Sequence, residues 1–194
     1  MLGMLLTLLL AASEPIDIDP VEAPDCSYDL AAMLALDRQA FDQDKGGGWR
    51  PLSNKQGCEI AAAELIRVWR YEKRDHASIL YWHEGQMRAS GGQIEEAIAL
   101  FNRSYVAPEL DTEFGWNHYV SGSIAFLERD RERLRSSIER LKEVPSPQNI
   151  SFTRPDGTVI ELDWPPNLKV LQAFERCWES SYEEAYSSAQ CRET

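Results

Sequence analysis

Residues 85–108 read GQMRASGGQIEEAIALFNRSYVAP, and this stretch decides the fold that the sequence predicts. Two segments with apolar residues at helical spacing are separated by Gly91-Gly92, which is typical of a pair of helices joined by a turn. The landmarks of the stretch return 37 residues later, where Gly85, Ala97, Phe101 and Pro108 recur as Gly122, Leu134, Ile138 and Pro145. One helix pair cannot bury both of its faces, so a repeated pair predicts a stack with a continuous core.

The repeated stretch resembles the tetratricopeptide repeat (TPR) family, most clearly over residues 78–146. In this resemblance Gly85 is the small residue where the two helices cross closely, and Gly92 is the turn glycine. The other matches are Tyr81 where the family prefers Trp, Ala97 at the small position, Phe101 at the aromatic position and Pro108 one place before the closing Pro. The departures are Glu84 for the usual Leu, Arg88 for Tyr and Ser104 for Ala.

The second copy resembles the family less closely. Gly122 and Pro145 match, but Arg129 occupies the position of the turn glycine, and the step is longer than the family's period of about 34 residues. Looser helix pairs are expected over residues 30–71 and around Ala173, Tyr182 and Ala185. The prediction is an all-α fold, a short TPR-like solenoid of antiparallel helix pairs, forming a single domain over residues 27–194.

Apolar periodicity, capping residues and breakers also predict where the elements lie. Helices are expected at residues 27–41, 59–71, 76–90, 94–105, 111–128, 131–144, 167–179 and 182–190. One small β-hairpin is expected near residues 150–163, because β-branched and aromatic residues flank Pro155-Asp156-Gly157.

The N-terminus predicts export. Residues 1–13 have the short apolar run and the small residues before a cleavage site that are typical of a signal peptide, although no Lys or Arg precedes the run. Residues 14–26, EPIDIDPVEAPDC, hold five acids, three prolines and no basic residue, which is typical of an extended leader. No Cys follows the run, so a lipid anchor is not expected, and no stable membrane anchor should remain after the signal is removed. The expected location is periplasmic or secreted.

Four cysteines, Cys26, Cys58, Cys177 and Cys191, are disulfide candidates in an exported chain. Pairing neighbours gives Cys26–Cys58 and Cys177–Cys191. A regular antiparallel pair would place Cys26 and Cys58 at opposite ends, beyond the ~7 Å Cα separation that a disulfide allows. Irregular local helices, another pairing and free thiols therefore remain open.

Charge and motifs exclude several functions. A net charge of −12 argues against nucleic-acid binding and against an anionic membrane surface. The three histidines, His76, His83 and His118, show no metal-ligand spacing, so no metal site is expected. No nucleophile elbow or phosphate loop is present. We therefore expect no cofactor and no enzymatic activity.

The resemblance implies a binding surface on the concave face formed by the first helix of each pair. Carried over residue by residue, the expected partner-binding residues are Trp82, Gln86, Trp116, Tyr119, Ser123 and Phe126. The alternative is that these side chains form core packing against the hairpin or a capping helix. The expected function is binding of a protein or peptide in the cell envelope. An enzyme or accessory acting on an envelope polymer, and a structural subunit of an envelope assembly, remain alternatives.

Overall fold

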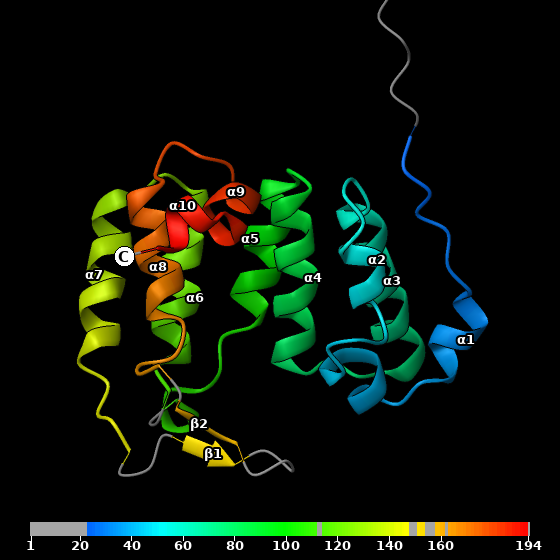
Figure 1. The fold of residues 1–194 in the computed structure, drawn as a ribbon, viewed down its shortest axis with the longest axis horizontal. Helices are drawn as coiled ribbons and strands as arrows, with labels where there is room; N and C mark the ends of the chain where they lie inside the picture. The colour runs from blue at the N-terminus through cyan, green and yellow to red at the C-terminus, as the bar shows by residue number, and fades with distance from the viewer. Residues whose placement is uncertain (1–22, 112–113, 148–150, 154–157, 162, 194) are drawn as a thin grey trace, which may run out of the picture.

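The computed structural model describes residues 23–111, 114–147, 151–153, 158–161 and 163–193, and this part of the chain is predominantly helical (Figure 1). The all-α prediction is thus confirmed at the level of fold class. The predicted signal peptide, residues 1–13, and most of the acidic leader lie outside the described residues. None of the described helices is long and apolar enough to cross a membrane.

Six helices stand side by side and form the stack at the centre of the fold (Figure 1). They are α3 (Glu59–Lys73), α4 (Ser78–Ser90), α5 (Ile94–Arg103), α6 (Trp116–Leu127), α7 (Arg131–Lys142) and α8 (Leu168–Arg176). Within the stack α4 packs on α3 and α5, and α6 packs on α7 and α8. The sequence places all six within a few residues, except for the start of α6.

Glycines permit close contact within both α4–α5 and α6–α7. A Cβ atom added at Gly85 would lie 2.7 Å from the Phe101 ring and 3.3 Å from the Leu100 Cβ atom. The equivalent atom at Gly122 would lie 3.2 Å from the Ser137 Cβ atom, at the same spacing along the chain. A larger residue at Gly85 would push α4 and α5 apart, whereas one at Gly122 would meet Leu171 of α8, at 2.7 Å, as well as Ser137 of α7. The glycine positions of the 37-residue repeat therefore have a common physical role.

Three helices end in the same way. Arg74, Gly92 and Arg129 adopt left-handed backbone angles, and the next N–H in each case bonds to a carbonyl five residues back. Arg129 stands where a glycine would avoid strain. Its guanidinium instead donates to the Trp178 and Ser180 carbonyls, which ties the α6–α7 turn to the segment after α8.

The sequence predicts that the helix now labelled α6 begins near residue 111, but in the structure it begins at Trp116. A short 3₁₀ turn (Pro108–Leu110) and Gly115, with a φ angle of 64°, precede it. The Asp111 carboxylate then accepts hydrogen bonds from the Trp116 and Asn117 N–H groups at 2.6 and 2.7 Å. Asp111 thus caps the helix from outside it.

The N-terminal segment corrects the prediction of one helix over residues 27–41. It forms α1 (Leu30–Ala35), a π-helical turn (Gln39–Gln43) and α2 (Arg50–Ser53). The break occurs because Leu36 is extended and Asp37 starts a new turn by accepting from the Ala40 N–H at 2.8 Å. No regular helix pair forms here, so the chain returns to bring Cys26 beside Cys58.

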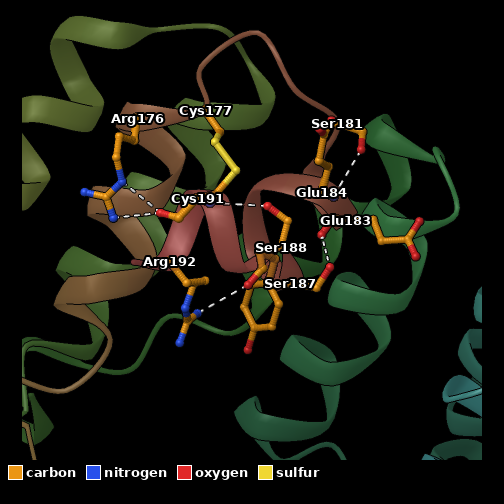
Figure 2. The surroundings of a disulfide bond; sticks show 10 residues. Arg176, Cys177, Ser181, Glu183, Glu184, Ser187, Ser188, Cys191 and Arg192 are labelled. Atoms are coloured by element: carbon orange, nitrogen blue, oxygen red, sulfur yellow. Dashed lines mark hydrogen bonds between the residues drawn. A yellow bond between two sulfur atoms is a disulfide. The ribbon is translucent and has the colours of Figure 1, made fainter. Parts of the chain in front are cut away.

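Both local disulfides are confirmed. The Cα atoms of Cys26 and Cys58 lie 5.4 Å apart, and those of Cys177 and Cys191 lie 5.7 Å apart. The second disulfide fixes two short helices, α9 (Tyr182–Ser187) and α10 (Ala189–Arg192), against α8 (Figure 2). Arg176 reinforces this contact by donating two hydrogen bonds, of 2.9 and 2.7 Å, to the Cys191 carbonyl (Figure 2).

Two short strands occupy the segment where the hairpin is expected. Strand β1 (Ser151–Thr153) pairs antiparallel with β2 (Val159–Glu161), with Phe152 opposite Ile160. The expected turn at Pro155-Asp156-Gly157 lies outside the described residues. In Figure 1 the strands lie below the helix stack, at the opposite end from α9.

Charged side chains join α3 to α4. Arg70 and Glu84 are almost completely buried and form an ion pair of 2.5 Å, while Arg88 pairs with Glu64 at 2.5 Å. The Arg70 guanidinium also lies 4.1 Å from the centre of the Tyr81 ring. Two departures from the repeat pattern, Glu84 and Arg88, are therefore explained, because both contact a helix that precedes the repeats.

Candidate functional site

Most residues of the predicted partner-binding face are buried in the core. Trp82, Tyr119, Ser123 and Phe126 are at most 3% exposed, and only Trp116 is half-buried. The Trp82 ring packs on Phe101, Tyr119 and Trp116, at centroid distances of 4.3, 4.7 and 5.0 Å. Phe126 stacks on Phe174 of α8 at 4.6 Å. The structure therefore favours the packing alternative, and the elements that cover this face are α8 and α9.

Two of the six line cavities: Trp116 borders a pocket of about 180 Å³, and the other is Gln86. Gln86 lines a cavity of about 290 Å³ between α4, α9 and the segment that contains α2. Figure 1 shows α2 and α9 on either side of the upper part of α4. The lining residues are Lys45, Trp49, Arg50, Ser53, Asn54, His83, Gln86, Met87, Ser90, Tyr182 and Tyr186. Hydroxyl, amide and basic groups from three separate segments thus meet at one place, which is typical of a ligand site.

A buried carboxylate orients the histidine of this cavity. Asp42 is completely buried, and its Oδ1 atom lies 2.6 Å from Nδ1 of His83. The same carboxylate accepts from the Trp49 indole at 3.1 Å and from the Gln43 amide at 2.5 Å. Burial alone would raise the pKa of Asp42, but the bonds and charge of His83, with Trp49 and Gln43, bring the pKa below its usual value. Asp42 is therefore ionised at neutral pH, and Nδ1 of His83 is assigned as the donor to it, while Nε2 has no hydrogen bond within the described part of the chain.

Two cations line the cavity without a carboxylate partner. Neither Lys45 nor Arg50 makes an ion pair with a described acid, and no described Asp or Glu lines the cavity. Arg50 donates to the backbone carbonyl of Asp42 and lies 4.4 Å from the centre of the Trp49 ring. Asp44, the neighbour of Lys45, accepts from the Gly46 N–H at 2.9 Å. The described lining thus carries two cations and no acid, with the ionised Asp42 carboxylate behind His83.

Tyr182 and Tyr186 form the wall that α9 contributes. Their rings stack at a centroid distance of 5.8 Å. The Tyr182 hydroxyl is buried and has no hydrogen bond of normal geometry within the described part of the chain. Burial, followed by the neighbouring Tyr186, raises the pKa of Tyr182 well above its usual value, whereas the nearby Gln86 amide lowers it. The phenol is therefore neutral and can still donate to a ligand, which would satisfy a buried polar group.

A larger groove of about 680 Å³ runs along α6 and α7. Its charged lining residues are two acids and two bases, Asp130, Glu132, Arg133 and Arg140, so it has no single charge preference. Asp130 caps α7 by accepting from the Arg133 N–H, and the Arg133 side chain pairs with Glu128 at 2.7 Å. We therefore place the candidate site at the smaller cavity.

Sequence reasoning missed most of this site. Asp42 and His83 are 41 residues apart and share no motif, and Tyr182 comes from the far end of the chain. No group of three or more potential metal ligands occurs among the residues that the structure describes.

Three comparisons with known proteins gave no relative. No family model, no curated protein and no solved structure matches the chain. The fold and the site therefore have to be interpreted from this chain's own geometry.

Proposed function

We propose that this chain is an exported TPR-like module that binds a protein or peptide partner, and that the cavity between α2, α4 and α9 receives one group of that partner. The observation that carries the proposal is the meeting of Gln86, from the expected binding helix, with His83, Lys45, Arg50 and Tyr182 around a cavity. The proposed site therefore keeps Gln86 from the expected face and leaves out the buried aromatic residues of that face.

The TPR-like interpretation is supported by the equivalent glycine contacts in the two helix pairs. Gly85 and Gly122 each approach the helix that follows, and Gly92 and Arg129 end their helices with the same hydrogen bond. Repeats of this kind act in most cases as scaffolds that present one surface to a partner. The period and the geometry support the proposal together.

Export is supported by the way the disulfides hold the cavity walls. Cys58 lies shortly after α2 and is tethered to Cys26, whereas Cys191 tethers the segment that carries Tyr182 and Tyr186 to α8. Such disulfides persist in oxidising compartments and are rare in the cytosol. Two disulfide-tethered segments around the cavity are what is expected of a protein that works outside the cytoplasm.

Site-specific photocrosslinking tests the proposal. A photoreactive amino acid at Asn54, which is exposed beside the cavity, should give a crosslink to one discrete partner in the producing cell. The matched control is Asn102, which is also exposed but lies on α5 and lines none of the cavities described above. Equal crosslinking from both positions, or none from Asn54, would count against a partner site here.

The alternative of an enzyme acting on an envelope polymer has one observation in its favour. The carboxylate–imidazole pair of Asp42 and His83 has the geometry of an oriented general base, and Ser53 and Ser90 line the same cavity. Turnover of a polymer that is lost in His83→Ala and retained in His118→Ala would favour this alternative. Binding of the polymer without turnover would favour a binding module.

A further inference from the structure

We infer that the group recognised in the cavity is an oxyanion, a carboxylate or a phosphate, held by Lys45 and Arg50 and lying beside His83. This inference rests on the proposed function, because it names the chemistry of the same site. Lys45 and Arg50 come from the segment before the repeats, so the anion would be bound mainly by residues outside the TPR-like helices.

The first argument is the charge of the cavity. The chain has a net charge of −12, and eight of its other 18 Lys and Arg residues pair with an acid within the described part of the chain. Lys45 and Arg50 nevertheless face one cavity without an acid among the described residues. Charges beyond about 10 Å are largely screened at physiological salt, so these nearby cations outweigh the distant acidic surface.

The second argument is the direction of the hydrogen-bonding groups. The guanidinium and the ammonium can only donate, and the buried Tyr182 hydroxyl has no hydrogen-bond partner among the described residues. Asp42 lies behind His83 and accepts from three donors of the protein, so its oxygens are occupied and it is not part of the described lining. An oxyanion, which only accepts, matches this set better than an ammonium or an amide group does.

The size of the cavity and the residues around it also fit a small anion. A cavity of about 290 Å³ holds a small group rather than a folded surface. Trp49 and Tyr182 are buried beside the polar groups and limit the entry of water. Partial burial strengthens each charge-assisted hydrogen bond to a bound anion.

Histidine NMR tests the inference directly. The oxidised chain carries ¹⁵N-histidine and is titrated with sodium phosphate, sodium acetate or neutral acetamide, with sodium chloride keeping the ionic strength constant. The ring signals of His83 should shift and saturate with at least one of the two anions, whereas those of His76 and His118 stay in place. Phosphate alone, acetate alone or both would identify the source of the oxyanion. An equal response to acetamide, or no response of His83, would overturn the inference.

Charge variants provide the second readout. Lys45→Gln and Arg50→Gln should each weaken the anion about threefold to tenfold, as expected for one lost charge-assisted contact. The matched controls Lys142→Gln and Arg135→Gln remove exposed cations on α7 and should leave the affinity unchanged. Arg50 also contacts Asp42 and Trp49, so Lys45→Gln, in an exposed loop, decides the matter if Arg50→Gln loses helical content.

The two proposals fail in different ways. If a partner is crosslinked from Asn54 but His83 shows no response to anions, the proposal of a binding module is kept and the proposal of an oxyanion ligand is rejected. A saturable anion response without any partner crosslink would make the cavity a small-molecule site and would remove the proposed partner.

Discussion

Both sides of the helix stack have an apolar core, but they differ in the contacts that are added to it. On the N-terminal side, α4 meets α3 and the preceding segment through two buried polar pairs, Arg70–Glu84 and Asp42–His83. On the C-terminal side, α6 meets α8 and α9 through aromatic rings, with Phe126 and Phe174 stacked and Tyr182 packed beside them. The cavity lies where the two chemistries meet, at α4 and α9.

The two interfaces should therefore respond differently to mutation and to pH. Aromatic packing tolerates small shifts and does not depend on pH. Removing one partner of a buried ion pair strongly destabilises the protein, because the other charge stays buried and unpaired. The polar side therefore fixes the position of the N-terminal segment, which carries Lys45 and Arg50 to the cavity. The aromatic side closes the face that the repeat would otherwise leave open.

The largest effect is expected from breaking the buried ion pair. Glu84→Gln keeps the shape but leaves Arg70 buried without its carboxylate, so the free energy of unfolding should fall by about 3 to 5 kcal/mol. Urea denaturation at neutral pH measures it. The double variant Arg70→Met with Glu84→Leu should recover most of the loss, because it removes both charges together. A loss under about 1 kcal/mol for Glu84→Gln would show that the pair is not a determinant of this interface.

The disulfides should come next. Replacing Cys26 and Cys58 by Ser should lower the free energy of unfolding by about 3 to 4 kcal/mol, and replacing Cys177 and Cys191 by about 3 kcal/mol, because the closed loops differ in length. Denaturation of the two paired variants measures the loss. Either variant should also weaken crosslinking from Asn54, since each disulfide holds one wall of the cavity. Full crosslinking in both would separate the disulfides from the site.

A pH-dependent effect of intermediate size is expected at Asp42. Its pKa is lowered on folding, so its contribution to stability is present above the usual value of 3.8 and is lost as the pH falls through the lower folded value. Asp42→Asn should therefore be about 1.5 to 3 kcal/mol less stable than the wild type at pH 7 and nearer to it at pH 3. Urea denaturation across this range checks the prediction. Parallel stability curves for the two proteins would contradict it.

The smallest effect is expected on the aromatic side. Phe126→Leu retains an apolar side chain and loses the stacked contact with Phe174, so the free energy of unfolding should fall by about 1 kcal/mol. The loss should be the same at pH 7 and pH 4, in contrast to Asp42→Asn. Denaturation at both pH values tests the comparison. A loss as large as that of Glu84→Gln would mean that the two interfaces are equally demanding.

The repeat made the six main helices predictable, because apolar periodicity, glycine turns and Asp130 as a cap are local signals. The N-terminal segment was not predictable, since Leu36 breaks an apolar pattern that continues through it. Local disulfide pairing was foreseeable from the order of the cysteines, but its geometry depended on that break. The cavity was the least predictable feature, because its groups come from residues 45–54, 83–90 and 182–186, and only tertiary packing brings them together.

Hydrogen–deuterium exchange of the oxidised chain, alone and with the partner captured at Asn54, tests whether the partner binds at the cavity between α2, α4 and α9. We expect the partner to slow exchange in residues 45–54, in the second half of α4 and in α9, and to leave α7 unchanged. Slower exchange along α6 and α7, with no change around His83, would place binding in the larger groove and would contradict the account.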